Sequence, residues 1–347
     1  MTLREVAAYL GGLAALFLPS LTSAHEVYIL NSDTIRAAVA ADSPNPFTAY
    51  ASNEYQFFFW GLISFIAMST ILATAVFHLF ERQAGPFFAY LKRFAHPIAR
   101  ITVGVSLIGF GLSGHLFGTE LALHDLFASF SGAMQAFFLL AGIALIAGLY
   151  TRYIAVLLIG VYAYAVFVFG SYVFTYTAHL GAYILLFSLG GGTWSLDHIF
   201  GTGNLTLRLA KLARHLVPYG FPILRICFGF GIMFAAVYGK FIHSELGLQA
   251  VLQYQLTDYF PFDPLFIVLG ALIIEFLAGA MIFTGIAIRW TGLFLIFWLI
   301  LSQFYFHEAW WVHVILFGAG LAIFCHGYDR YSLEGRFFKR HSNEPIL

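Results

Sequence analysis

The chain has few cysteines and few charges, and both shortages narrow its class. Only two of its 347 residues are cysteine, Cys227 and Cys325, and neither belongs to a CxxC or CxxCH motif. This spacing argues against a structural disulfide, a thiol redox pair and covalently attached haem. Charged residues make up 10% of the chain, against about 25% in a soluble domain. So few charges cannot cover a water-facing surface, and the mean hydropathy of +0.84 indicates a protein whose main solvent is lipid.

Sequence motifs for nucleotide, phosphate and hydrolytic chemistry are also absent. The chain has no P-loop, no GxSxG, no HExxH and no dinucleotide-binding fingerprint. The glycine-rich stretch "GFGLSG" at 109–114 lies inside an apolar run, where a phosphate-binding loop is not expected. The formal net charge of zero says nothing about nucleic acid in a chain of this kind, because the position of the charges matters more than their sum. We expect a lipid bilayer and no nucleic acid as a partner.

The first 24 residues have the features of a secretory signal peptide. Arg4 precedes an apolar stretch, and small residues at 22–24 provide a cleavage site; an uncleaved first helix is the alternative. Cleavage would leave a periplasmic arm at 25–55 that begins with His25, and "SPNP" at 43–46 would interrupt regular structure in it. An N-terminal histidine offers an amine and an imidazole to one copper ion, so His25 is a candidate metal ligand.

Nine apolar runs are long enough to cross a bilayer, which takes about 20 residues. They lie near 56–79, 98–118, 127–149, 152–173, 175–192, 220–241, 264–286, 288–306 and 309–327. Of the 17 lysines and arginines, all but Arg4, Arg36 and Lys240 fall on one side of this arrangement. Because such residues collect in cytoplasmic loops, the sequence predicts a multi-pass protein of a bacterial inner membrane. Its mature N-terminus would be periplasmic and its C-terminus cytoplasmic.

One segment of the chain occurs twice. "HPIARITVGVSLIGFGLSGH" (96–115) and "FPILRICFGFGIMFAAVYGK" (221–240) share a proline, two isoleucines, an arginine and two glycines at constant spacing. Farther along, a Gly-x-x-x-Arg motif recurs at 148–152 and 285–289, and a closing Gly…Ser-Leu-Asp/Glu motif recurs at 190–197 and 327–334. The two copies have the same orientation in the membrane, so they form a parallel repeat.

The repeat predicts an all-α, polytopic membrane protein with two tandem four-helix bundles and one leading transmembrane helix. The leading helix lies at 56–80, the first four-helix unit at 94–197 and the second at 219–335. An amphipathic cytoplasmic linker at 198–218 joins the units, because Leu209, Leu212 and Leu216 recur at helical spacing opposite basic residues. Residues 336–347 form a cytoplasmic tail.

The repeated unit resembles the DoxX family. The matching elements are the arginine-led first helix with its glycines, the acidic residue and Gly-x-x-x-Arg of the second helix, and the closing motif. The second unit fits better because it contains Lys240 and Glu275, where the first unit has His115 and Phe138. The family includes the membrane subunit of thiosulfate:quinone oxidoreductase, so the resemblance implies a small quinone-linked membrane module.

Arg225 and Glu275 are the candidate catalytic residues. Each lies within an apolar run, and an ionised carboxylate inside a membrane needs a partner. We expect Arg225 to hold Glu275 in a bidentate pair that handles a quinone headgroup or its proton; a pair that only fixes helix register is the alternative. In the first unit Arg100 has the neutral Gln135 within plausible reach, which favours the second unit as the working half.

Titratable side chains gather at the predicted periplasmic edge. The candidates for a quinone or substrate mouth are Lys240, His307, Glu308, His313, His179 and His115. Neighbouring imidazoles and carboxylates suit a proton relay or a metal shell, whereas an interfacial belt that includes Trp310 and Trp311 is the structural alternative. His179 and His313 occupy equivalent positions and could in principle ligate haem, but we expect neither haem nor a firmly bound metal.

These features favour a quinone-linked oxidoreductase subunit whose electron-donor side faces the periplasm and meets a periplasmic or membrane partner protein. A non-catalytic scaffold or assembly subunit is the second interpretation, and a transporter of small solutes or copper is the third. The lack of cysteine pairs favours a scaffold, whereas an ionisable pair inside the membrane favours activity. The sequence leaves open whether the chain is an enzyme.

Overall fold

The computed structural model describes residues 30, 32–51, 53–200 and 207–337, and the chain is 84% helical with no strand in these ranges. Seven helical stretches in the described part are long and apolar enough to cross a membrane. One of them, 151–189, contains two of the expected spans, and the shorter apolar helix Trp310–His326 supplies the last. The all-α, polytopic membrane fold is therefore confirmed, whereas the signal peptide and most of the tail lie outside the described residues.

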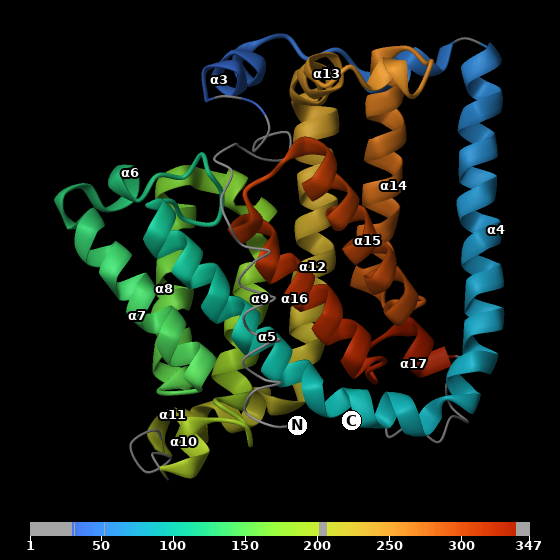
Figure 1. Ribbon diagram of the computed structural model, residues 1–347. Helices are drawn as coiled ribbons and strands as arrows, with labels where there is room; N and C mark the ends of the chain where they lie inside the picture. The colour runs from blue at the N-terminus through green and yellow to red at the C-terminus, as the bar shows by residue number, and fades with distance from the viewer. Residues whose placement is uncertain (1–29, 31, 52, 201–206, 338–347) are drawn as a thin grey trace.

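Figure 1 shows the arrangement of these helices. The helices before the linker are α3 (Ser32–Ala40), α4 (Asn53–Gln83), α5 (Gly85–Ser113), α6 (Leu123–Phe127), α7 (Ser131–Ala147), α8 (Thr151–Phe169) and α9 (Thr177–Leu189), with 3-10 turns η1 (Pro46–Ala51), η2 (Ala128–Phe130) and η3 (Gly170–Tyr176). The linker contains α10 (Leu196–Ile199), α11 (Leu207–Ala213) and η5 (Arg214–Tyr219). The helices after it are α12 (Gly220–Val237), α13 (Ser244–Gln253), α14 (Pro264–Thr284), α15 (Ile288–Phe306), α16 (Trp310–His326) and α17 (Leu333–Phe337), with η6 (Tyr238–Ile242) and η7 (Leu256–Asp258).

The two units interlock instead of standing apart as separate bundles. The first helix of each unit packs on the fourth helix of the other, α5 on α16 and α12 on α9, about as extensively as on the second helix of its own unit. Small residues make this approach possible: Gly318 of α16 lies against Thr102 of α5, and Gly181 of α9 lies against Cys227 of α12. Thr102 and Cys227 are equivalent positions of the repeat, so the interface itself is pseudo-symmetric.

Within each unit the first two helices cross at paired glycines. Gly104 of α5 faces Gly142 of α7, and Gly229 of α12 faces Gly279 of α14. A β-carbon on Gly229 would lie 2.5 Å from the backbone nitrogen of Phe283 and 2.6 Å from the carbonyl oxygen of Gly279. These crossings set the register of each helix pair through backbone contact alone.

The helix preceding the first unit and the start of that unit differ from the expected boundaries. α4 runs along the outside of the second unit, where Phe77 stacks on Trp290 with ring centroids 3.6 Å apart. α5 begins at Gly85, well before the expected 94, and its first part crosses beneath the second unit before the helix turns up into the first (Figure 1). Pro97 in its interior lacks the N–H that would bond to the preceding turn, which accounts for the bend.

Two polar segments are folded onto the helices. The expected periplasmic arm contains α3, which packs on α13 through Ala38 and Leu246. The linker is not one continuous amphipathic helix: α11 ends at Ala213 and a 3-10 turn containing Pro218 follows it. Leu209 and Leu216 pack on the core, whereas Leu212 is 65% exposed.

We expect Gly229→Ala to lower the free energy of unfolding by about 1–3 kcal/mol, because the added methyl group meets fixed backbone atoms of α14. Gly270→Ala is the matched control, since nothing lies within 4 Å of a β-carbon at Gly270 and alanine favours a helix. Thermal unfolding of the purified protein in detergent should show a lower Tm for the first variant and an equal or higher Tm for the second. Equal Tm values for the two variants would argue against the glycine crossing.

Candidate functional site

A cavity of about 120 Å³ lies between the two units. Its walls come from η3 and α9 of the first unit and from α12, α14, α15 and α16 of the second. The polar groups on the second-unit wall are Lys240, Glu275 and His313, and His179 lies on the first-unit wall. The cavity includes Tyr238, Gly239 and Lys240, which lie shortly before α13, and we call this end of the bundle the upper end because α13 lies near the top of Figure 1.

Lys240 and Glu275 form an ion pair on the wall of this cavity. Lys240 Nζ lies 2.8 Å from Glu275 Oε2, and both side chains are largely buried. Trp298 Nε1 donates to the other carboxylate oxygen over 3.4 Å. Lys240 belongs to η6, a π-helical turn that continues α12, and such turns are frequent at functional sites.

Residues 220–308 match the family model DoxX. This segment is a DoxX domain. It contains α12, α14 and α15 with the Lys240–Glu275 pair, and its match confirms the family resemblance of the second unit. No curated protein and no solved structure matches the chain.

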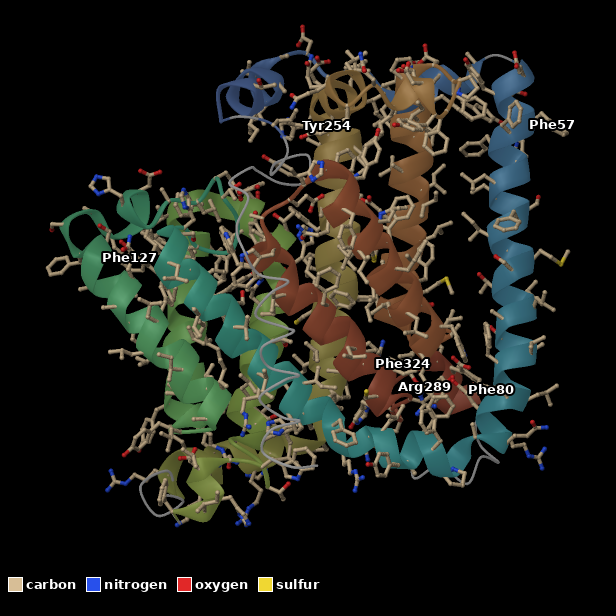
Figure 2. The ribbon with its side chains drawn as sticks, viewed as in Figure 1. Phe57, Phe80, Phe127, Tyr254, Arg289 and Phe324 are labelled. Carbon is tan, nitrogen blue, oxygen red and sulfur yellow. The ribbon has the colours of Figure 1, made fainter. Side chains whose placement is uncertain are left out.

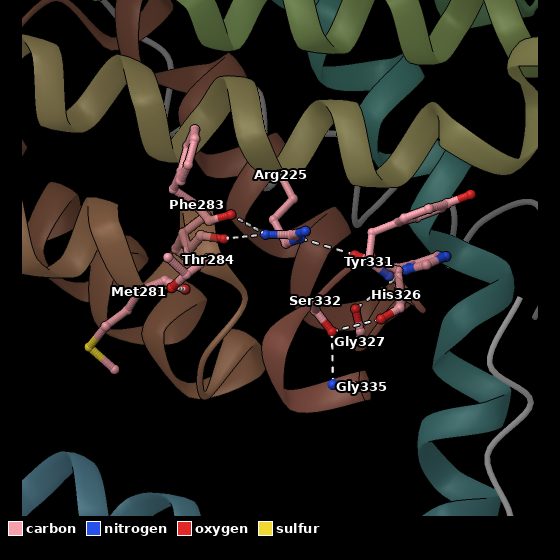
Figure 3. A network of polar contacts seen from close by, with 11 residues as sticks. Arg225, Met281, Phe283, Thr284, His326, Gly327, Tyr331, Ser332 and Gly335 are labelled. Atoms are coloured by element: carbon pink, nitrogen blue, oxygen red, sulfur yellow. Dashed lines mark hydrogen bonds and ion pairs between the residues drawn. The ribbon is translucent and has the colours of Figure 1, made fainter. Parts of the chain in front are cut away.

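The expected pair between Arg225 and Glu275 of the DoxX domain is wrong. Arg225 lies near the lower end of α12, where its Nε lies 3.0 Å from Asp329 Oδ2. The same guanidinium donates to the carbonyl oxygens of Ile282, over 2.9 Å, and Phe283. Figure 3 shows Arg225 between the end of α14 and the loop that follows α16. The arginine therefore binds carbonyls in the last turn of α14, where the hydrogen bonds of the helix run out.

Helix register explains why Glu275 pairs with a lysine. The contact of Gly229 with Gly279 and Phe283 places Glu275 about ten residues of α12, or about 15 Å, above Arg225. Helical side chains also tilt toward the N-terminus of their helix, which is the lower end of α12. Arg225 therefore points away from Glu275, whereas Lys240, about 7 Å above the carboxylate, points down toward it.

The expected contact between Arg100 and Gln135 is also wrong. Arg100 donates to the carbonyl oxygens of Gly191 and Trp194 at the lower end of the first unit. The Gln135 side chain lies beside Gly114, at the opposite end of α5. The arginines of both units thus bind backbone carbonyls at the lower end, and a carboxylate lies near each of them, Asp329 in the second unit and Asp197 in the first.

A second buried network anchors α4 to the lower end of the DoxX domain. Arg289 Nη1 lies 3.6 Å from Glu81 Oε1 of α4, and Arg289 Nε donates to the Phe324 carbonyl oxygen over 3.1 Å. Figure 2 shows Arg289 close to Phe324 and Phe80. Tyr328 donates to Glu81 over 2.6 Å. Burial and the nearby carboxylates of Glu334 and Glu81 raise the pKa of Tyr328, so this hydroxyl keeps the proton that it donates.

Of the six residues expected at the mouth, Lys240, His313 and His179 line the cavity. Glu308 lies behind His313, with its Oε2 2.8 Å from His313 Nε2, and Ser302 donates to the other oxygen over 2.6 Å. A carboxylate in this position fixes the orientation of an imidazole.

His307 and His115 lie away from the cavity. His307 is exposed and ends α15 in a left-handed conformation with φ of 54°. The Nδ1 of His115 lies 2.9 Å from the Ser113 carbonyl oxygen, in the loop after α5. Proximity in sequence to Glu308 therefore does not bring His307 to the site, because adjacent residues point in different directions.

His179 is a buried imidazole whose hydrogen bonds are not satisfied. It is 1% exposed, and neither ring nitrogen makes a hydrogen bond of full geometry, although the Tyr176 backbone makes a weaker one to the ring. Aromatic rings surround it, with the Phe117 centroid at 4.8 Å. A buried polar group without a partner is costly, and here it lies on the wall of a cavity opposite the DoxX domain.

Within the described ranges, no three His, Cys, Asp or Glu side chains are grouped so that they could hold a metal ion. His25, the candidate copper ligand, lies outside the described residues.

Glu120 is a candidate functional residue whose partners the sequence did not reveal. It lies in the loop between α5 and α6, and its Oε1 accepts hydrogen bonds from Tyr172, over 2.8 Å, and Tyr176. Both tyrosines line the cavity. Burial raises the pKa of Glu120 from 4.5 to about 7, although the hydroxyls of Tyr176 and Tyr172 oppose the shift. A contact with residues so far along the chain has no local signal in the sequence.

We expect Lys240→Met and Glu275→Gln each to destabilise the protein by about 3–5 kcal/mol, because each leaves a buried group without its partner. The double variant K240M/E275Q should lose clearly less than the sum of the two single losses. A double-mutant cycle on the free energy of unfolding measures this coupling. Additive losses would mean that the two side chains do not interact.

We expect the stability of the protein to fall as pH rises from about 4.5 to about 7, through the contribution of Glu120. The folded pKa of Glu120 lies above its unfolded value, so the folded state binds more protons in this window. Thermal unfolding of the wild type and of Glu120→Gln across this range provides the test. The variant should lack this part of the decline, and identical profiles would contradict the assignment.

Proposed function

We propose that the cavity between the two units binds the headgroup of a membrane quinone and that the protein is a quinone-linked subunit of an oxidoreductase. The observation that carries this proposal is the Lys240–Glu275 pair on the wall of a small, largely apolar cavity inside a membrane protein. Ionisable residues within a membrane are costly and usually serve a function.

The cavity suits a single ring. Its volume of about 120 Å³ is slightly below the roughly 150 Å³ of an engineered protein cavity that binds benzene. Trp298, Tyr238 and Phe228 provide flat apolar surface on its walls. A headgroup of one ring, with polar atoms at its edge, matches both the size and the mixture of walls.

The polar groups suit a ring with two carbonyl oxygens. Lys240 can donate to an oxygen on the second-unit side, and the unsatisfied His179 can donate to one on the first-unit side. Glu275 can take or give a proton next to the lysine. A bound quinone would supply two-electron redox chemistry; the residues named here hold it, orient it and exchange protons with it.

The orientation of the protein follows from its charges. The buried arginines of both units bind loops at the lower end, and lysine and arginine mark the cytoplasmic side. We therefore infer that the protein lies in a bacterial inner membrane and that its upper end, which contains the cavity, faces the periplasm. An electron donor, carried by a periplasmic or membrane partner protein, would approach from that side.

A scaffold role is the second candidate, because Lys240 and Glu275 also satisfy each other's charge without a ligand. In a scaffold this pair would only fix the register of α12 against α14. Ligand binding separates the two functions.

The test is a titration of the full-length protein in nanodiscs with a short-chain 1,4-benzoquinone, followed by quenching of tryptophan fluorescence. Trp298→Phe identifies the signal from the cavity. We expect K240M/E275Q, in which the pair is replaced together, to raise Kd about tenfold or more, as the loss of a hydrogen bond from a charged donor does. Lys211→Met changes an exposed lysine of the linker and should leave Kd unchanged. No saturable quenching in the wild type would support the scaffold.

A further inference from the structure

The loop between α5 and α6 closes the first unit directly beside the cavity. Phe117 of this loop is fully buried, with φ of 59°, and stacks on Tyr176 with ring centroids 5.6 Å apart. Gly118 follows it, and a β-carbon there would collide with the Tyr176 hydroxyl and with the Glu120 carboxylate. Only glycine therefore allows the carboxylate and the hydroxyl to meet at this point.

Glu120 connects the surface of this loop with the cavity wall. The residue is partly exposed, but its carboxylate points inward, where Oε1 accepts from Tyr172 and Tyr176 and Oε2 is buried without a hydrogen-bond partner. The rings of both tyrosines line the cavity on the first-unit side. Hydrogen bonds thus link the Glu120 carboxylate of the loop to two tyrosines of the cavity wall.

We propose that Glu120 and the hydroxyls of Tyr176 and Tyr172 form the proton path between the upper aqueous face and the cavity. This inference rests on the proposed quinone site and assigns the route of its protons. When the electron donor passes two electrons to a bound quinone, the quinone also takes up two protons, and each would come from a tyrosine hydroxyl while Glu120 returns a proton to the tyrosine oxygen. Glu120 then takes up a proton from water. Oxidation of a bound quinol by an added oxidant runs the same proton transfers in reverse.

The surroundings of Glu120 suit such a transfer. The groups that act on its carboxyl are the Tyr176 hydroxyl, its own backbone amide and the Tyr172 hydroxyl, and no charged side chain is among them. With a pKa of about 7, the carboxyl is present in both protonation states near neutral pH, as an efficient proton carrier requires. Glu275 on the cavity wall is paired with Lys240, and Glu308 is only 4% exposed and is held by Ser302 and His313, so both lie farther from water.

The experiment uses the full-length protein in nanodiscs, loaded with a short-chain benzoquinol and mixed rapidly with ferricyanide. The reaction balances as one quinol and two ferricyanide ions giving one quinone, two ferrocyanide ions and two protons. Absorbance follows the loss of ferricyanide, and a pH dye in weak buffer follows the protons. The affinity for quinol is measured separately by fluorescence quenching.

We expect Glu120→Gln to slow both quinol oxidation and proton release about tenfold or more while the Kd for quinol stays at the wild-type value. Glutamine can still accept the tyrosine hydrogen bonds, so the loop should keep its fold. The wild-type rate should rise with pH around 7, and this rise should be absent in the variant. Tyr176→Phe, which keeps the carboxyl but removes a hydroxyl, should also slow the reaction. Glu245→Gln, in α13 at the same end, is the control and should behave as the wild type.

A wild-type rate and an unchanged pH profile in Glu120→Gln would overturn the proton path while leaving the quinone site intact. Failure of the wild type to bind quinol would overturn the proposed function, and the path with it. The two failures are thus distinguished by the binding measurement.

Discussion

The buried cations of this protein each require an acceptor inside the membrane, and this requirement determines how the helices end and meet. At the lower end Arg100 binds carbonyl oxygens of a loop and Arg225 binds those of the last turn of α14. Arg289 lies between the Phe324 carbonyl and Glu81, and Lys240 meets Glu275. Leaving one such charge unpaired in a medium of low dielectric would cost several kcal/mol. The contacts of these side chains therefore restrict where each loop can lie.

The two units share the same glycine-ended helix and the same arginine–carbonyl contact, and the second unit makes an additional contact with a carboxylate. Gly148 and Gly285 end α7 and α14 in the same left-handed conformation, and Arg152 and Arg289 bind the equivalent carbonyls of Phe187 and Phe324. In the second unit Arg289 also meets the carboxylate of Glu81 from α4, whereas Arg152 of the first unit has Asp197 of its own unit nearby. The second unit thus binds α4 and carries the matched domain.

The interlocked packing of the units places the cavity between them. Because α9 packs on α12, the first unit contributes His179, Tyr172 and Tyr176 to a cavity whose opposite wall carries Lys240 and Glu275. Neither unit alone has both walls. Both copies of the four-helix unit are therefore needed to form the cavity, because one copy supplies polar groups that the other lacks.

The sequence by itself determined the helices, the repeat and the lower-end position of the arginines, because apolar run length, glycine punctuation and charge distribution are local properties. It also indicated Lys240, His313 and His179 as neighbours of one site. Only the tertiary structure decided which charges meet. The pairing of Glu275 with Lys240 and of Arg225 with Asp329 depends on the register of α12 against α14, which contacts such as that of Gly229 with Gly279 set. The contact of Glu120 with Tyr176 depends likewise on a loop folding back onto a distant turn. Register and loop placement arise from packing between segments far apart in the chain, and no local pattern of residues encodes them.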